Sequence, residues 1–122
     1  MKLAAYLAAL ALLSPGDVSI AQDAQAGADL WRGCRACHAV GPDARNLVGP
    51  ILNGLSGRRA GTVAGFISYS DAMKNAGIVW SEATFKRYAA NPQAAIPGSK
   101  EGFSGLRTEK DAADLWAYLK QF

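Results

Sequence analysis

The feature of this sequence that most constrains its fold is the pentapeptide Cys-Arg-Ala-Cys-His at residues 34–38. Cys34 and Cys37 are the only cysteines in the chain, and His38 is its only histidine. A Cys-x-x-Cys-His run is the attachment signature of a c-type haem. Two thiols one helical turn apart can reach the two vinyl groups on one edge of a porphyrin, and the histidine that follows is then delivered beneath the iron. The motif therefore predicts one covalently attached haem c per chain, with His38 as the proximal iron ligand.

Other roles for these side chains are less consistent with the sequence. A disulfide between the two cysteines suits an exported protein, and a redox-active dithiol suits the Cys-x-x-Cys spacing. A thioredoxin-like dithiol, however, belongs in a βαβ pattern, which this sequence lacks. A structural zinc site needs four ligands, whereas this motif supplies three at most. Haem attachment is the favoured interpretation, ahead of the dithiol and then of zinc.

The first 21 residues are expected to be a secretory signal peptide. After Met1 and Lys2 comes an apolar run over residues 3–13, shorter than the about 20 residues that span a bilayer. Residues 19–21, Ser-Ile-Ala, offer a small-x-small cleavage site. We therefore expect one mature domain over residues 22–122, with Ala24 as a second candidate cleavage point. A membrane-anchoring helix kept in the mature protein is less consistent with this pattern, so no stable membrane insertion is expected.

Hydrophobic periodicity predicts an all-α domain of short helices joined by long loops. Four stretches have helical spacing, and they cover residues 24–37, 71–76, 82–90 and 111–122. Their candidate N-terminal capping residues are Asp23, Ser70, Ser81 and Thr108. The third helix is expected to stop before Pro92.

Long loops separate these helices, and residues 44–62 are rich in glycine. Loops of more than about 12–15 residues are unusual in a compact domain unless they have a function. Hydrophobic residues nevertheless make up 50% of the chain. An apolar cofactor at the centre of the domain, around which the loops wrap, would account for both observations.

From about Gly27 to its C-terminus, the chain resembles the class I c-type cytochromes, the family of mitochondrial cytochrome c and bacterial cytochrome c2. The matching segments are CRACH, Gly49-Pro50 followed by NGLSGR, SYSDAMKNAGIVW, NPxxxIPGSK and the terminal DLWAYLK. The resemblance implies the small cytochrome c fold, in which short helices and long loops wrap around the haem. It also implies that the first and last helices cross, with contacts among Gly27, Trp31, Leu115 and Tyr118.

The same resemblance implies roles for several side chains around the haem. It assigns the Pro50 carbonyl as the acceptor of the His38 imidazole N–H. Around a haem propionate it places Arg58, Tyr69 and Trp80, and it adds Phe103 to the residues that contact the haem. For Trp80 and Tyr69 the alternative is ordinary core packing, and for Arg58 it is a solvated charge.

The sequence departs from the family at the sixth iron ligand. The family has a methionine after its Pro-Gly-Thr-Lys segment, whereas here Glu101 follows Pro-Gly-Ser-Lys. The carboxylate of Glu101 could bind ferric iron, hold a water on it, or leave the position open; the alternative is that Glu101 is merely exposed. Met73 is expected to pack in the core, and Lys74 and Lys100 to be solvated rather than to bind iron.

These features predict an exported electron carrier, located in a bacterial periplasm, that is not an enzyme apart from weak peroxidase-like activity. A hard anionic oxygen ligand favours ferric iron and predicts a low redox potential. The partners expected are membrane or soluble redox proteins that a monomer meets by transient docking. Nucleic acid is not expected, because the net charge is only +3 without a run of basic residues. The alternative function is a haem protein with an open sixth position that binds nitric oxide, carbon monoxide or peroxide.

Overall fold

The computed structural model describes residues 22–100 and 102–122, so the expected signal peptide and Glu101 lie outside the described residues. Within these ranges the secondary structure is helical, with no strand and one isolated antiparallel bridge between Arg59 and Val79. This agrees with the all-α prediction. The helices are α1 (Ala24–Trp31), α2 (Asp71–Lys74), α3 (Glu82–Ala90), α4 (Pro92–Ala95) and α5 (Glu109–Leu119). No helix of the described ranges has both the length and the apolar character needed to cross a membrane.

The first helix begins where the sequence predicts but ends earlier. The carboxylate of Asp23 accepts hydrogen bonds from the backbone N–H groups of Gln25 and Ala26, at 2.9 and 3.2 Å. The helix ends at Trp31, so the prediction that it continues through Cys37 was wrong. Gly33 lowers helix propensity by about 1 kcal/mol relative to alanine, and from residue 32 the backbone continues as single turns.

Capping side chains also define the later helices. Ser70 caps α2, Ser81 forms a capping box with Thr84 in α3, and the Thr108 hydroxyl accepts from Asp111 N–H. The predicted range of α3 is confirmed, whereas α5 begins at Glu109 and ends at Leu119. Proline stops α3 but also starts a helix that the sequence analysis missed. Asn91 caps α4 and Pro92 occupies its first turn, where a missing N–H costs nothing.

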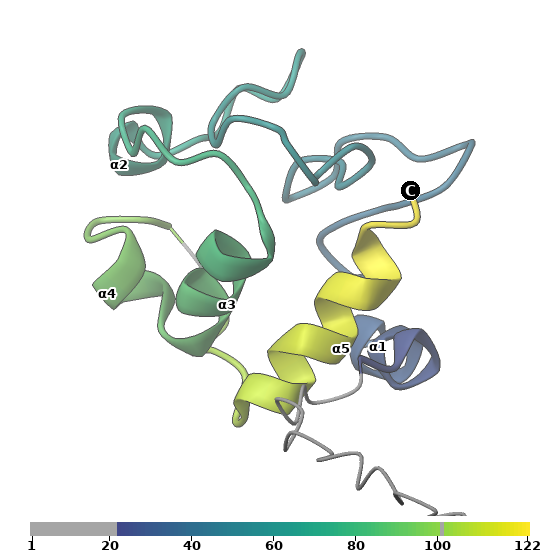
Figure 1. Cartoon of the computed structure of the whole chain (residues 1–122). Helices are drawn as coiled ribbons and strands as arrows, with labels where there is room; N and C mark the ends of the chain where they lie inside the picture. Colours follow the sequence, from purple (N-terminus) through teal and green to yellow (C-terminus); the bar gives the residue numbers. More distant parts are fainter. Residues whose placement is uncertain (1–21, 101) are drawn as a thin grey trace, which may run out of the picture.

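The first and last helices cross in close contact, as the resemblance implied. α5 packs against α1 on one side and against α3 on the other, and Figure 1 shows it between them. The backbone of Gly27 meets α5 so closely that a Cβ at residue 27 would lie 2.0 Å from the carbonyl oxygen of Asp114. The rings of Trp31 and Tyr118 pack with their centroids 6.1 Å apart. The crossing therefore depends on the missing side chain of Gly27.

The core extends from this crossing across α5 to α3. The rings of Phe85 and Trp116 pack with their centroids 5.4 Å apart. Residues from the loops complete the core, and the buried hydrophobic cluster contains Trp31, Leu55, Ala60, Trp80, Phe85, Tyr88, Ala89, Ile96, Ala112, Leu115, Trp116 and Leu119. Met73 packs against this cluster, as expected from the sequence. The cluster thus joins all the larger helices to the loops before α2 and after it.

We predict that Gly27→Ala destabilises the domain by about 3 kcal/mol, the upper part of the range for overpacked cores. The added methyl group would force α1 away from the α5 backbone. Gly33→Ala is the matched control, because its Cβ would lie 3.6 Å from the nearest atom, Leu30 O. Urea unfolding of the haem-containing protein would measure both variants. Equal stability of the two variants would contradict the close crossing.

Candidate functional site

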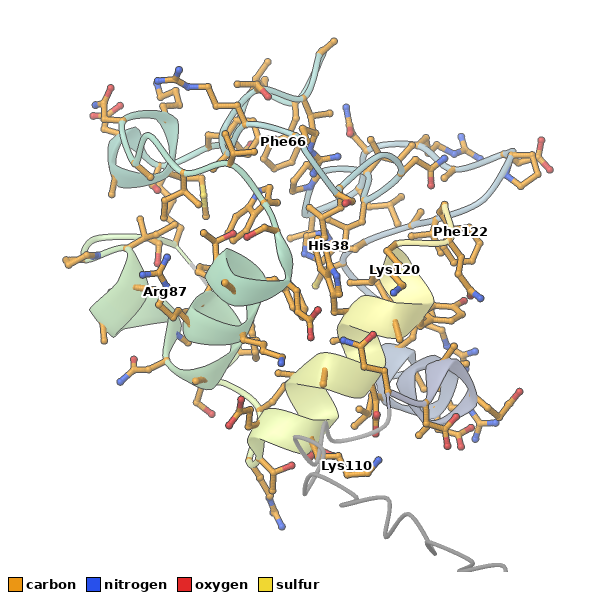
Figure 2. All side chains as sticks on the ribbon, viewed as in Figure 1. His38, Phe66, Arg87, Lys110, Lys120 and Phe122 are labelled. Atoms are coloured by element: carbon orange, nitrogen blue, oxygen red, sulfur yellow. The ribbon has the colours of Figure 1, made fainter. Side chains whose placement is uncertain are left out.

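One cavity, with a volume of about 510 Å³ that includes space open to solvent, contains the predicted proximal histidine. Figure 2 shows His38 in the middle of the molecule, between α3 and α5. The cavity is lined by His38, Pro50, Leu52, Leu55, Arg58, Gly61, Tyr69, Met73, Trp80, Phe85 and Tyr88. Most of these side chains are apolar, and they come from loops as well as from helices.

The imidazole of His38 is held on two sides. Its Nδ1 lies 2.7 Å from the carbonyl oxygen of Pro50. Since a carbonyl only accepts, Nδ1 carries the proton and Nε2 keeps its lone pair. The ring face packs on Gly49, where a Cβ would lie 2.3 Å from Cε1 of His38. This is the arrangement of a metal-binding histidine, in which the hydrogen bond of one nitrogen fixes the orientation of the other.

The two thiols lie on the turns that connect α1 to His38. Cys34 is partly buried and packs against the core cluster, whereas Cys37 is exposed. Both Cys37 N–H and His38 N–H donate to the carbonyl of Cys34, each at 3.0 Å, and Gly49 N–H donates to the carbonyl of Cys37 at 2.7 Å. These backbone bonds join the cysteine turn directly to the segment that holds the histidine ring.

A half-buried cation contributes to another part of the cavity wall. Arg58 donates from Nη1 to the carbonyls of Ile51 and Asn53, at 2.9 and 3.0 Å. Burial lowers the pKa of Arg58 from its ordinary value, and the electrostatic interaction with Tyr69 opposes this shift. Among the described residues no carboxylate forms an ion pair with Arg58. Its charge is therefore available to an anionic group inside the cavity.

Two aromatic residues that the resemblance assigned to the propionate line the same cavity. The Tyr69 hydroxyl accepts from Val63 N–H at 3.1 Å, and its ring packs edge-on against Phe66. Trp80 is 7% exposed and packs edge-on against Tyr88, with centroids 5.2 Å apart. Both residues thus pack against neighbouring aromatic rings and also line the cavity.

The remaining sequence candidates lie differently. Phe103 is absent from the cavity lining and is 41% exposed, although its ring centroid lies 6.4 Å from that of Tyr88. Glu101 lies outside the described residues. The sequence analysis missed Leu52, Leu55, Phe85 and Tyr88 as cavity residues. The spacing of Phe85 and Tyr88, three residues apart on α3, was a signal that could have found them.

The described residues fit a c-type haem. The cavity offers apolar walls for a porphyrin, a histidine with a free Nε2, and an uncompensated arginine for a carboxylate. The two cysteines are placed one turn apart, next to that histidine. A cofactor with an apolar body, anionic substituents and an iron atom satisfies all of these groups together.

The comparisons with known proteins point to one family. A cytochrome c2 of Rhodoplanes tepidamans is 58% identical over 101 residues, which cover 83% of this chain and 94% of that protein. A cytochrome c2 of Blastochloris viridis is 52% identical over 102 residues, which cover 84% of this chain and 80% of that protein. The solved structure of cytochrome cH from Methylobacterium extorquens superposes with a TM-score of 0.76 at 39% identity, and the match covers 82% of this chain and 99% of that one. No family model matches the sequence.

We predict that Gly49→Ala displaces the His38 ring and breaks its hydrogen bond to Pro50. The added methyl group would overlap the ring, so the iron–imidazole bond should weaken. The absorption and EPR spectra of the ferric protein should change, and its haem content should fall. Gly33→Ala again serves as the control, since it adds a methyl group beside the same motif with only an ordinary van der Waals contact, 3.6 Å from Leu30 O. A Gly49→Ala protein with an unchanged ferric spectrum would refute the packing.

Proposed function

Since this chain belongs to the class I c-type cytochromes of the cytochrome c2 type, we propose that it carries single electrons between redox proteins of the bacterial periplasm. The chain binds one haem c covalently, as its family does. The observation that carries the proposal is the contact of His38 with Pro50 and Gly49 inside a largely apolar cavity. Cys34 and Cys37 are the attachment points, and His38 Nε2 is the proximal ligand.

The haem supplies an iron atom that cycles between its ferric and ferrous states. Pro50 O fixes the tautomer of His38, so that the iron-facing nitrogen keeps the same geometry in both states. Leu55, Trp80 and Phe85 are buried and would cover the haem with apolar surface. The charge of Arg58 would pair with a haem propionate. A site in which the iron is shielded in this way would change little on electron transfer, which is the requirement for a carrier.

For the sixth position we propose that the Glu101 carboxylate either binds the ferric iron or holds a water on it. The support is the sequence, since Glu101 occupies the place of the family's methionine after residues 96–100. An anionic oxygen stabilises ferric iron more than a thioether does, and axial-ligand identity is a main determinant of haem potential. The potential should therefore lie below that of a methionine-ligated relative.

The second candidate is a haem protein that binds a small ligand at an open or labile sixth position. The observation that favours it is the same loss of the family's methionine. Because His38 is the chain's only histidine, no second histidine can act as an acid–base catalyst. Turnover of peroxide should therefore be weak.

Export, docking and assembly follow from the same proposal. Residues 22–122 form the mature domain, and the protein acts as a monomer that docks transiently on membrane or soluble redox proteins. Exposed cations without an ion pair in the described ranges include Arg35, Arg45 and Lys100. These charges suit a partner with an acidic docking face.

Two measurements on the exported holoprotein separate the candidate functions. An electron carrier should titrate reversibly with one electron and bind carbon monoxide slowly or not at all in its ferrous form. A ligand-binding protein should bind carbon monoxide readily in that form. A high-spin ferric spectrum alone does not separate the two, because the carboxylate or water ligand proposed for the carrier also produces one. An irreversible titration, or one that needs more than one electron, would contradict the carrier proposal.

Glu101→Met should raise the redox potential by on the order of 0.1 V, within the range that axial ligands control. The ferric EPR spectrum should become fully low-spin, because a thioether then fills the sixth position. Glu109→Met is the matched control, since it replaces an exposed carboxylate at the start of α5. Equal potentials for Glu101→Met and the parent protein would rule out Glu101 as the ligand.

A further inference from the structure

The carbonyl that accepts from His38 belongs to a peptide group whose other end is also hydrogen-bonded. Pro50 O lies 2.7 Å from Nδ1 of His38. The N–H of the same peptide group, on Ile51, donates to Oδ1 of Asn46 at 2.9 Å. No described peptide bond is cis, and a planar trans peptide directs its C=O and its N–H to opposite sides. A single rigid group thus lies between the imidazole and the side chain of Asn46.

The backbone donors on either side of this peptide group are paired with backbone acceptors. Gly49 N–H donates to the carbonyl of Cys37 at 2.7 Å. Leu52 N–H donates to the carbonyl of Ala39 at 3.1 Å. Proline has no N–H, so the N–H of Ile51 is the one donor of residues 49–52 that is satisfied by a side chain.

The amide of Asn46 is held at both of its polar atoms. Its Nδ2 donates to the carbonyl of Ala64 at 3.1 Å, while its Oδ1 accepts from Ile51 N–H. An amide oxygen only accepts and an amide nitrogen only donates, so these two partners select one orientation of the amide. The residue is half-buried, and the oxygen of Asn46 therefore faces the peptide group that binds His38.

We propose that Asn46 is a positioning residue for the proximal ligand, and that it acts on His38 through the Pro50–Ile51 peptide group. The Asn46 relay consists of Asn46 Oδ1, this peptide group and His38 Nδ1. An acceptor on the N–H of an amide draws electron density toward the amide oxygen, and hydrogen bonds in a chain strengthen one another by about 10–30% per bond. The relay should therefore make Pro50 O a stronger acceptor and the imidazole a more basic ligand.

The relay affects the redox potential through the basicity of His38 Nε2. A hydrogen bond at the outer nitrogen of a metal-binding histidine raises the basicity of the ligating nitrogen. Hydrogen bonding around the axial ligand is one of the means by which a protein sets a haem potential. A more basic imidazole stabilises ferric iron more than ferrous iron, so the relay lowers the potential. This inference rests on the proposed electron-carrier function and adds a residue that tunes it.

A mechanical tether between two loops is the alternative role of Asn46. Its bond to Ala64 reaches the loop that carries Phe66, which Figure 2 shows above His38. A tether needs both hydrogen bonds of the side chain, because it joins two segments. The relay needs only the bond to Ile51. Substitutions that remove the two bonds separately therefore distinguish these roles.

The first test compares Asn46→Leu with Asn46→Asp in the haem-containing protein. Asn46→Leu removes the acceptor of Ile51 N–H, whereas Asn46→Asp keeps an acceptor, now charged, and loses the donor to Ala64 O. The midpoint potential should rise with Asn46→Leu and fall with Asn46→Asp. Each change should be roughly twofold in the equilibrium constant for reduction, the size expected when a charge-assisted bond loses or gains about 10–30% of its strength.

Shifts of the two potentials in the same direction, or no shift in either variant, would overturn the relay, because the tether is broken in both. Ala64→Asp is the charge-matched control. Ala64 is exposed, and a carboxylate there adds the same charge near Asn46 without replacing the acceptor of Ile51 N–H. Its potential should stay closer to that of the parent protein than the potential of Asn46→Asp does. An equal fall with Ala64→Asp would overturn the relay, because the added charge alone would account for the change.

The second test is the NMR spectrum of the ferric protein with cyanide bound. Cyanide occupies the sixth position in every variant, so the resonance of the His38 Nδ1 proton reports on the proximal side alone. This resonance should move in opposite directions in Asn46→Leu and Asn46→Asp. If Asn46→Leu does not fold, Asn46→Ala replaces it, and an unshifted resonance in both remaining variants would overturn the relay. Failure of the electron-carrier proposal would instead appear as an irreversible titration of the parent protein.

Discussion

The crossing of α1 and α5 is the contact on which the rest of this structure depends. It requires a glycine at residue 27, because a side chain there would collide with the backbone of Asp114. The cysteine turn begins where α1 ends, so the crossing determines where the thiols and His38 lie. The Cys-x-x-Cys-His motif lies on turns rather than on a helix. Its position is set by the packing of α1, which ends just before it. This explains how a short turn can hold the imidazole of His38 in a fixed place.

Between His38 and α2, side-chain hydrogen bonds satisfy backbone groups that a helix or sheet would otherwise pair. Asn53 accepts from Gly41 N–H and donates to Gly41 O, at 2.9 and 2.7 Å. Asn46 accepts from Ile51 N–H and donates to Ala64 O. In the described ranges no buried side-chain N or O atom is left without a partner. Backbone polar groups must be satisfied wherever they are buried, and these asparagines allow loops rather than helices to form one wall of the cavity.

The accuracy of the sequence-based prediction differed between kinds of feature. Capping residues such as Ser81 and Thr108 act within one turn, so their positions could be read directly. The end of α1 was missed because a glycine such as Gly33 is tolerated inside a helix as well as in the turn that follows one. The start of α4 was missed because a proline such as Pro92 can end one helix and also occupy the first turn of the next. Large separation in sequence limited the prediction of the site residues more than the prediction of the helices. Leu55 and Tyr88 reach the same cavity from a loop and a helix, and no local pattern encodes that meeting.

The segments on either side of residue 101 are each anchored by hydrogen bonds to the neighbouring helices or their caps. Before it, Gln93 Nε2 donates to Ser99 O at 2.6 Å, and Ser99 N–H donates to Ile96 O at 3.0 Å. After it, Leu106 N–H donates to Ala89 O at 2.7 Å. The preceding flank is thus held by the side chain of Gln93 on α4 and by the backbone of its C-cap Ile96, and the following flank by the backbone of α3. None of these three bonds uses the side chain of residue 101. Under the ligand role proposed above for Glu101, replacing this residue should therefore alter the potential and the spin state of the iron rather than the fold.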